Sequence, residues 1–191
     1  MRPALLLSLL SLIALVSLVS AEELSPKAVP AIGSIAPAFG LYLLAGDDDE
    51  RGEAVQLDSV CGLRPGESKG VLLLFTDAQH VSGLEIANGL YRKFHKEGLE
   101  VLAVAVDKKP IDLRSKVEKL RLRFPVLDDR FGIVASRYGL AAAPFSILMN
   151  SECRILGFSN KTLAAEQEAL SGSIEALVNE QIGARSGSMD D

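Results

Sequence analysis

The sequence is poor in the residues that bind metals, nucleic acids and membranes. It contains only two histidines and two cysteines, and aromatic residues make up 5% of the chain. Acidic residues outnumber basic ones by 25 to 20, so the formal net charge is −5. Surfaces that bind nucleic acids or anionic membranes need clustered lysine and arginine. The composition therefore argues against nucleic acids and membranes as partners. It favours a protein, a peptide or a small molecule as the partner.

The first 21 residues are typical of a secretion signal. A basic residue at position 2 precedes an apolar run over 4–19, and small or branched residues stand three and one positions before a cut after Ala21. The run is shorter than the ~20 residues of a membrane-spanning helix, and serines interrupt it. We therefore expect a signal peptide over 1–21 and an exported protein, periplasmic or secreted, that is free of the membrane after cleavage.

The rest of the chain, about 170 residues, is long enough for one domain with a full hydrophobic core. Residues 22–31 hold two prolines without apolar periodicity, which predicts a linker before a domain over 32–183. The last residues, 184–191, are typical of a disordered tail. Inside the domain, the acidic run 47–50 separates two short apolar segments and predicts a surface hairpin loop.

From residue 71 onward the pattern alternates between strands and helices. Continuous apolar runs over 71–75 and 101–106 predict buried strands, and a three- to four-residue apolar period over 84–94 predicts a helix between them. We further expect a helix over 110–120, an extended segment over 124–127, a short helix over 130–138, strands over 145–149 and 154–158, and an amphipathic helix over 163–178. This order predicts an α/β fold in which helices flank both faces of a central mixed sheet.

Three short segments carry patterns that occur together in one family. Residues 32–39 include Gly-x-x-Ala-Pro-x-Phe, and residues 124–129 read Phe-Pro-Val-Leu-Asp-Asp. Tyr-Gly-Leu at 138–140 precedes Ala-Pro-Phe and a strand at 143–149. In their order and spacing these segments resemble the thioredoxin-like redoxins, which include peroxiredoxins and exported thiol-disulfide oxidoreductases. The resemblance covers about 32–183 and implies a thioredoxin-like fold.

The resemblance also implies a redox site in the loop after the strand at 71–75. The family carries Cys-x-x-Cys or one peroxidatic cysteine there, because the amino terminus of the next helix stabilises a thiolate. The corresponding positions of this chain are His80, Val81, Ser82 and Gly83. No cysteine occurs between Cys61 and Cys153, so this degenerate site lacks the nucleophile that attacks a disulfide or a peroxide.

His80 admits two interpretations. It is either a base or metal ligand at the redox position, or a residue that caps or solvates the loop. The only other histidine, His95, lies at the far end of the following helix, and no nearby spacing supplies the several ligands that a metal needs. We therefore expect the loop or capping role, with no metal and no cofactor.

Pro144 matches the one active-site element of the family that this chain keeps. In the resembled proteins this proline follows a cis peptide bond beside the dithiol, and its neighbours pair with an extended substrate segment. The resemblance implies a cis bond between Ala143 and Pro144, whereas a proline that merely begins a strand is the alternative. A cis bond here would leave a groove that binds a peptide by strand addition without redox chemistry.

Cys61 and Cys153 are expected at the end of the sheet opposite the degenerate site. In the implied fold the strands at 71–75 and 145–149 are antiparallel, so Cys61 before the first and Cys153 after the second belong to the same end. An exported chain meets an oxidising compartment, which favours a structural disulfide between them. Two unpaired thiols are the alternative, followed by a relocated redox pair, for which neither position offers a helix amino terminus.

These observations leave two main functions open, beside a third, a structural envelope protein that associates with itself through its last helix. The first is a non-catalytic binding or scaffold module that keeps the redoxin fold and the proline groove, with a protein or peptide as its partner. The second is a thiol-disulfide oxidoreductase or a peroxiredoxin-like enzyme that works through Cys61 and Cys153. The oligomeric state is not predicted.

Overall fold

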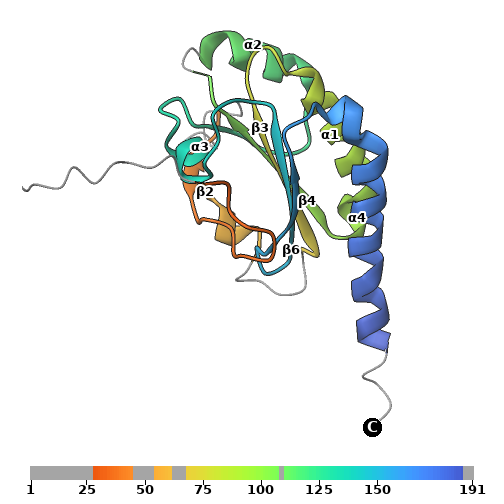
Figure 1. Cartoon of the computed structure of the whole chain (residues 1–191). Helices are drawn as coiled ribbons and strands as arrows, with labels where there is room; N and C mark the ends of the chain where they lie inside the picture. Colours follow the sequence, from red (N-terminus) through yellow and green to blue (C-terminus); the bar gives the residue numbers. More distant parts are fainter. Residues whose placement is uncertain (1–27, 45–53, 62–67, 108–109, 187–191) are drawn as a thin grey trace, which may run out of the picture.

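The computed structural model describes residues 28–44, 54–61, 68–107 and 110–186 (Figure 1). The expected signal peptide at 1–21, the first part of the linker and the acidic run 47–50 lie outside these ranges. In the part of the chain that is described, no helix has the length and apolar character needed to cross a membrane.

A five-stranded mixed sheet forms the centre of the molecule, in the order β5-β4-β3-β6-β7. Its strands are β3 (Gly70–Thr76), β4 (Leu99–Ala105), β5 (Val126–Asp128), β6 (Phe145–Asn150) and β7 (Ile155–Ser159). The pairs β3–β4 and β4–β5 are parallel, whereas β6 runs antiparallel to both β3 and β7. A separate antiparallel pair joins β1 (Gly40–Tyr42) to β2 (Ala54–Gln56), as the two apolar segments on either side of the acidic run predicted.

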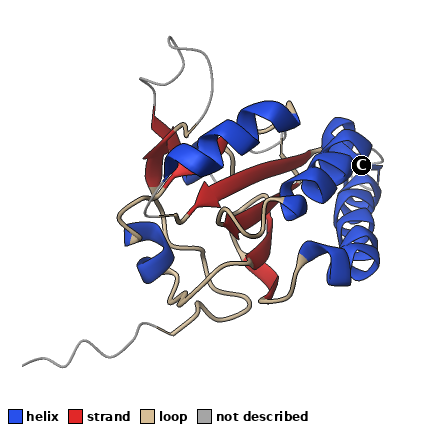
Figure 2. Cartoon of the chain, turned by 90° about the horizontal axis from the view of Figure 1, so that it is seen from above, coloured by secondary structure: helices blue, strands red, loops and turns tan. Residues whose placement is uncertain are grey.

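Helices cover both faces of the sheet, which confirms the predicted α/β class. Leu72 and Leu74 of β3 belong to the core under α1 (Ser82–Phe94), α2 (Pro110–Leu120) and α4 (Leu163–Ser186). The alternate residues Val71, Leu73 and Phe75 belong to a second core under α3 (Ile133–Arg137) and the short 3₁₀ helix η1 (Leu57–Ser59). In Figure 1, α1 and α4 lie on one side of the sheet and α3 on the other, and in Figure 2 the strands lie between them.

The last helix of the chain and the 3₁₀ helix before β4 end in different ways. The last helix ends at Ser186. After α1, the 3₁₀ helix η2 (His95–Glu97) ends at Gly98, whose φ of 105° is strained for any residue with a Cβ atom. This glycine turns the chain directly into β4.

The sheet has two ends with different chemistry. At one end, which we call the His80 pole, the loop over 77–81 follows β3 and meets the start of β6, since Phe75 is paired with Phe145. At the other end, the disulfide pole, Gly70 is paired with Asn150 and the turn after β6 contains Cys153. The degenerate redox positions and the cysteines are therefore separated by the length of β3.

Candidate functional site

The loop over 77–81 is held in a defined conformation by Asp77. Its Oδ1 atom accepts hydrogen bonds from the backbone N–H groups of Gln79 and His80 at 2.9 and 3.1 Å. From outside the loop, Lys116 of α2 donates a hydrogen bond to the carbonyl of Ala78 at 2.9 Å. The Thr76 hydroxyl, which is buried at the end of β3, donates to the carbonyl of His80 at 3.3 Å.

His80, which the sequence pattern predicts at the family's thiol position, lies in the loop between β3 and α1. Its Nδ1 atom lies 2.7 Å from Asp77 Oδ1, and both side chains are about 70% covered, with exposed fractions of 29% and 28%. Val81 is the N-cap of α1 and makes no side-chain capping bond, Ser82 begins the helix, and Gly83 follows in its first turn. The four degenerate positions therefore form one continuous turn, and the imidazole is its only titratable group.

The peptide bond between Ala143 and Pro144 is cis, as the resemblance implied. Pro144 lies beside the loop, because it lines a small recess together with His80 and Gly83. This recess, which we call pocket 1, has a volume of about 40 Å³. Its remaining lining comes from the end of β3, the first turns of α1 and α4 and the start of β6: Leu74, Phe75, Thr76, Ser82, Leu84, Phe145, Thr162, Leu163 and Ala164.

A larger recess, pocket 2, opens on the other side of Phe75. It has a volume of about 400 Å³ and is lined by Asp77, by Val106 after β4, by α3 and by the segment that leads to the cis bond. Small side chains dominate that segment, which reads Ala141-Ala142-Ala143. Pockets 1 and 2 thus flank Phe75, and together they form the recessed surface of the His80 pole.

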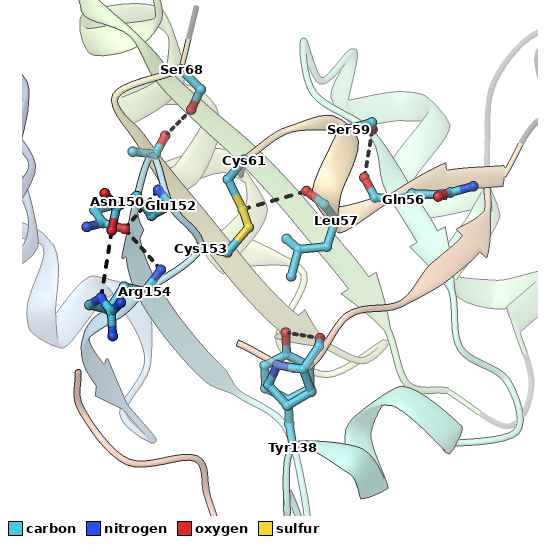
Figure 3. Close-up of a disulfide and its surroundings, with 12 residues drawn as sticks. Gln56, Leu57, Ser59, Cys61, Ser68, Tyr138, Asn150, Glu152, Cys153 and Arg154 are labelled. Carbon is cyan, nitrogen blue, oxygen red and sulfur yellow. Dashed lines mark hydrogen bonds and ion pairs between the residues drawn. A yellow bond between two sulfur atoms is a disulfide. The ribbon is translucent and has the colours of Figure 1, made fainter. Parts of the chain in front are cut away.

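The two cysteines form a disulfide at the opposite pole (Figure 3). Their Cα atoms lie 5.3 Å apart, and the residues are 3% and 7% exposed. Cys61 follows η1, and Cys153 lies in a turn in which Asn150 Oδ1 accepts the N–H groups of Glu152 and Arg154 at 3.0 Å each. Among the helices that the structure describes, none begins at Cys61 or Cys153.

Sequence reasoning did not detect the pairing of Asp77 with His80 or the contribution of α4 to pocket 1. The first had a local signal, because Asp-x-x-His at the end of a buried strand places a carboxylate and an imidazole in one turn. The second had none, since Thr162 and Leu163 reach the pocket only through the packing of α4 against α1. Among the residues that the structure describes, no group of three His, Cys, Asp or Glu side chains is placed to hold a metal ion.

The sequence profile of the AhpC/TSA family matches residues 32–160, most of the folded domain. The chain belongs to the AhpC/TSA family. This assignment confirms the redoxin resemblance and explains why the fold keeps the cis-proline segment beside the β3–α1 loop. A search of curated proteins found no match.

Several solved structures of similar fold are named as thiol-disulfide proteins. A protein provisionally called the thiol:disulfide interchange protein DsbE, from Chlorobium tepidum, is 23% identical, with a TM-score of 0.66 over 78% of this chain and 98% of its own. The thioredoxin domain of a thiol-disulfide oxidoreductase from Bacteroides vulgatus is 21% identical, with a TM-score of 0.62 over 78% and 99%. A secreted disulfide oxidoreductase from Mycobacterium tuberculosis is 21% identical, with a TM-score of 0.57 over 73% and 96%. At these identities the likeness establishes the thioredoxin-like fold.

Proposed function

We propose that this protein is an exported, non-catalytic member of the AhpC/TSA family that binds an extended peptide segment of a partner protein at the His80 pole. The observation that carries this proposal is the placement of sulfur. The β3–α1 loop has none, and Cys61 and Cys153 are joined and buried at the other pole.

The chemistry of the family needs an accessible thiolate. Thiol-disulfide exchange proceeds by attack of a thiolate on a disulfide sulfur, and peroxide reduction begins with attack of a thiolate on oxygen. At the His80 pole the nucleophile is replaced by an imidazole that is hydrogen-bonded to a carboxylate. At the disulfide pole, the burial of both cysteines slows the approach of a substrate thiolate to the folded protein. Catalysis would therefore lack a nucleophile at the His80 pole and access to the sulfur atoms at the disulfide pole.

Binding requires a surface of suitable shape, and the His80 pole has one. In an extended peptide, neighbouring side chains point to opposite sides. A segment laid across Phe75 and the Ala143–Pro144 bond would direct one side chain into pocket 1 and the next into pocket 2. Strand addition to exposed backbone is a common mode of peptide recognition and needs no covalent step.

An enzymatic function through Cys61 and Cys153 is the second candidate, favoured by the family and by the names of the similar structures. One assay distinguishes the two candidate functions. Oxidised and reduced mature protein are tested for reduction of insulin with dithiothreitol and for consumption of hydrogen peroxide, with Cys61→Ser as the matched variant. We expect turnover no higher than the background without protein. Turnover that Cys61→Ser abolishes would overturn the non-catalytic proposal.

Peptide binding is tested with a displayed library of random decapeptides and isotope-labelled mature protein. We expect enriched peptides to shift the backbone amide resonances of Phe75, Gly83 and Phe145, all at the His80 pole, and to leave those of Cys153 and Arg154 unchanged. A library without enriched sequences, or shifts confined to the disulfide pole, would contradict the proposed site.

Export is tested by the amino-terminal sequence of the protein recovered from the periplasm or the medium. The sequence pattern over 1–21 supports this part of the proposal. We expect the mature chain to begin at Glu22. A chain recovered with Met1 intact from the cytoplasm would contradict export.

A further inference from the structure

The Asp77–His80 pair has a geometry that a loop-stabilising role alone does not need. Asp77 Oδ1 already closes the turn through the backbone N–H groups of Gln79 and His80. Its additional contact, 2.7 Å to His80 Nδ1, fixes the orientation of the imidazole ring. Because a carboxylate only accepts hydrogen bonds, Nδ1 carries the proton, and Nε2 of the neutral ring is an acceptor.

His80 is one of the residues that line pocket 1. Asp77 lines pocket 2 and His80 lines pocket 1, so the ring stands between the two with its Nδ1 edge toward the carboxylate. Nε2 has no hydrogen-bond partner among the residues that the structure describes. The turn that carries the ring is braced by Lys116 and Thr76, so the acceptor is held in place before any ligand arrives.

We propose that His80 Nε2 is the polar anchor of the peptide site: it accepts a hydrogen bond from a backbone N–H of an extended peptide whose adjacent small aliphatic side chain fills pocket 1. This inference rests on the proposed function and names the chemistry of its ligand.

The walls of pocket 1 determine the side chain. Leu74, Leu84, Phe145 and Leu163 are apolar and buried, and about 40 Å³ holds a side chain such as that of alanine or valine but no aromatic ring. The polar residues of the lining are Thr76, His80, Ser82 and Thr162. An anionic ligand is disfavoured because the Asp77 carboxylate lies directly behind the ring.

The test uses mature full-length protein and a defined probe. The probe is a heptapeptide of alternating serine and valine, acetylated and amidated, together with analogues in which one amide N–H at a time is replaced by an ester oxygen. Dissociation constants are measured for the wild type, His80→Phe, which keeps a flat ring without the acceptor, and His80→Gln, which keeps an acceptor. His95→Phe is the matched control, because His95 lies at the opposite end of α1.

We expect one ester analogue to bind the wild type about 3- to 10-fold more weakly than the parent peptide, the effect of one hydrogen bond. His80→Phe should bind the parent more weakly by the same factor and no longer distinguish that analogue, whereas His80→Gln and His95→Phe should retain the difference. The ¹⁵N resonance of His80 Nε2 should move upfield when the parent binds the wild type, a readout that does not depend on the folding of any variant.

Three outcomes would overturn the inference. Equal binding of the parent peptide to the wild type and His80→Phe, or an ester effect that persists in His80→Phe, removes the anchor but leaves peptide binding intact. An Nε2 resonance that is unchanged when the peptide binds would likewise overturn the anchor role of His80 and leave peptide binding intact. Failure of the parent peptide, and of peptides selected from the library, to shift any amide at the His80 pole removes the anchor and the proposed function together.

Discussion

Single side chains give the two ends of β3 opposite properties. At the His80 pole, a carboxylate and an imidazole are partly open to solvent, and their contact can change with a ligand. At the disulfide pole, the sulfur atoms are covered and covalently joined. His80 therefore offers hydrogen-bonding capacity in the β3–α1 loop, which contains no thiol.

Tyr138 should make the protein sensitive to alkaline pH. Its side chain is fully buried and its hydroxyl donates to the carbonyl of Pro37 at 2.9 Å. Burial raises the pKa of Tyr138 well above its ordinary value, and the charge of Arg137 lowers it by less. An unfolded tyrosine loses its proton near pH 10, while the folded one keeps it, so the unfolded state binds fewer protons above that pH.

The expected result is a fall in the free energy of unfolding of about 1.4 kcal/mol per pH unit above pH ~10. Urea unfolding at a series of pH values measures it. Tyr138→Phe should be less stable at neutral pH by about 1 kcal/mol, because it leaves the carbonyl of Pro37 without its donor, and should show a shallower alkaline decline. Parallel alkaline declines for the two proteins would contradict the assignment to Tyr138.

Gly98 should be intolerant of alanine. Its φ is 105°, and a Cβ atom there would lie 2.8 Å from Cγ of Lys69. We expect Gly98→Ala to lower the free energy of unfolding by about 1–2 kcal/mol. Gly172→Ala in α4 is the matched control: its Cβ meets no atom within 4 Å, and we expect a gain of about 0.5–1 kcal/mol. Equal effects of the two changes would refute this explanation.

At the scale of elements, the position of α4 decides the shape of pocket 1. The helix supplies Leu163 at its start and packs against α1 along its length, and Ile174, Leu177 and Val178 are core residues. Near the disulfide pole, Lys69 donates a hydrogen bond to the carbonyl of Val178 at 2.8 Å. The helix is thus attached to the sheet at both poles, and a shift at one end would alter the recess at the other.

The contact between Gly70 and Leu177 tests this attachment. A Cβ atom on Gly70 would lie 2.4 Å from Cδ2 of Leu177 and 3.2 Å from the carbonyl oxygen of Met149. Gly70→Ala should cost about 1–3 kcal/mol by overpacking. In a double-mutant cycle with Leu177→Ala, the double variant should be more stable than the sum of the single losses predicts. Additive losses, measured by urea unfolding, would show that Leu177 is not the obstacle.

Most elements could be predicted from the sequence, because apolar periodicity is a local property. The strand expected over 71–75 is β3, and the helix expected over 84–94 lies within α1. The fold followed from the order of these elements and from the family patterns at 32–39 and 124–129. Helix ends were less predictable, as Ser186 at the end of α4 shows, since a helix can propagate without an apolar contact at every turn.

The candidate site was only partly predictable. The position of His80 and its lack of sulfur could be read from the sequence, but pocket 1 is formed by residues as distant as Leu74 and Leu163. The volume between such residues depends on how a helix packs on a sheet, which no local pattern encodes. The same holds for the division of the surface into a small and a large recess around Phe75.

At the scale of the whole molecule, the disulfide should be the largest single contribution to stability. It joins residues 92 positions apart, and the chain-entropy model assigns about 4–5 kcal/mol to a loop of that length. The variant with Cys61→Ala and Cys153→Ala should lose a free energy of unfolding approaching this value, measured by urea unfolding. Dithiothreitol should destabilise the wild type and leave the variant unchanged. A loss below about 1 kcal/mol would mean that the bond constrains little.

The ring closed by this bond also determines how the chain responds to a protease. It encloses β3, α1, β4, α2, β5, α3 and β6, whereas β7 and α4 lie outside it. A single cut anywhere between positions 62 and 152 leaves both fragments covalently linked, so they migrate as one band in a non-reducing gel and separate only after reduction. A cut within α4 releases its fragment in either gel. A protein that a protease has cut inside the ring would therefore keep all residues of the His80 pole in one covalently linked particle.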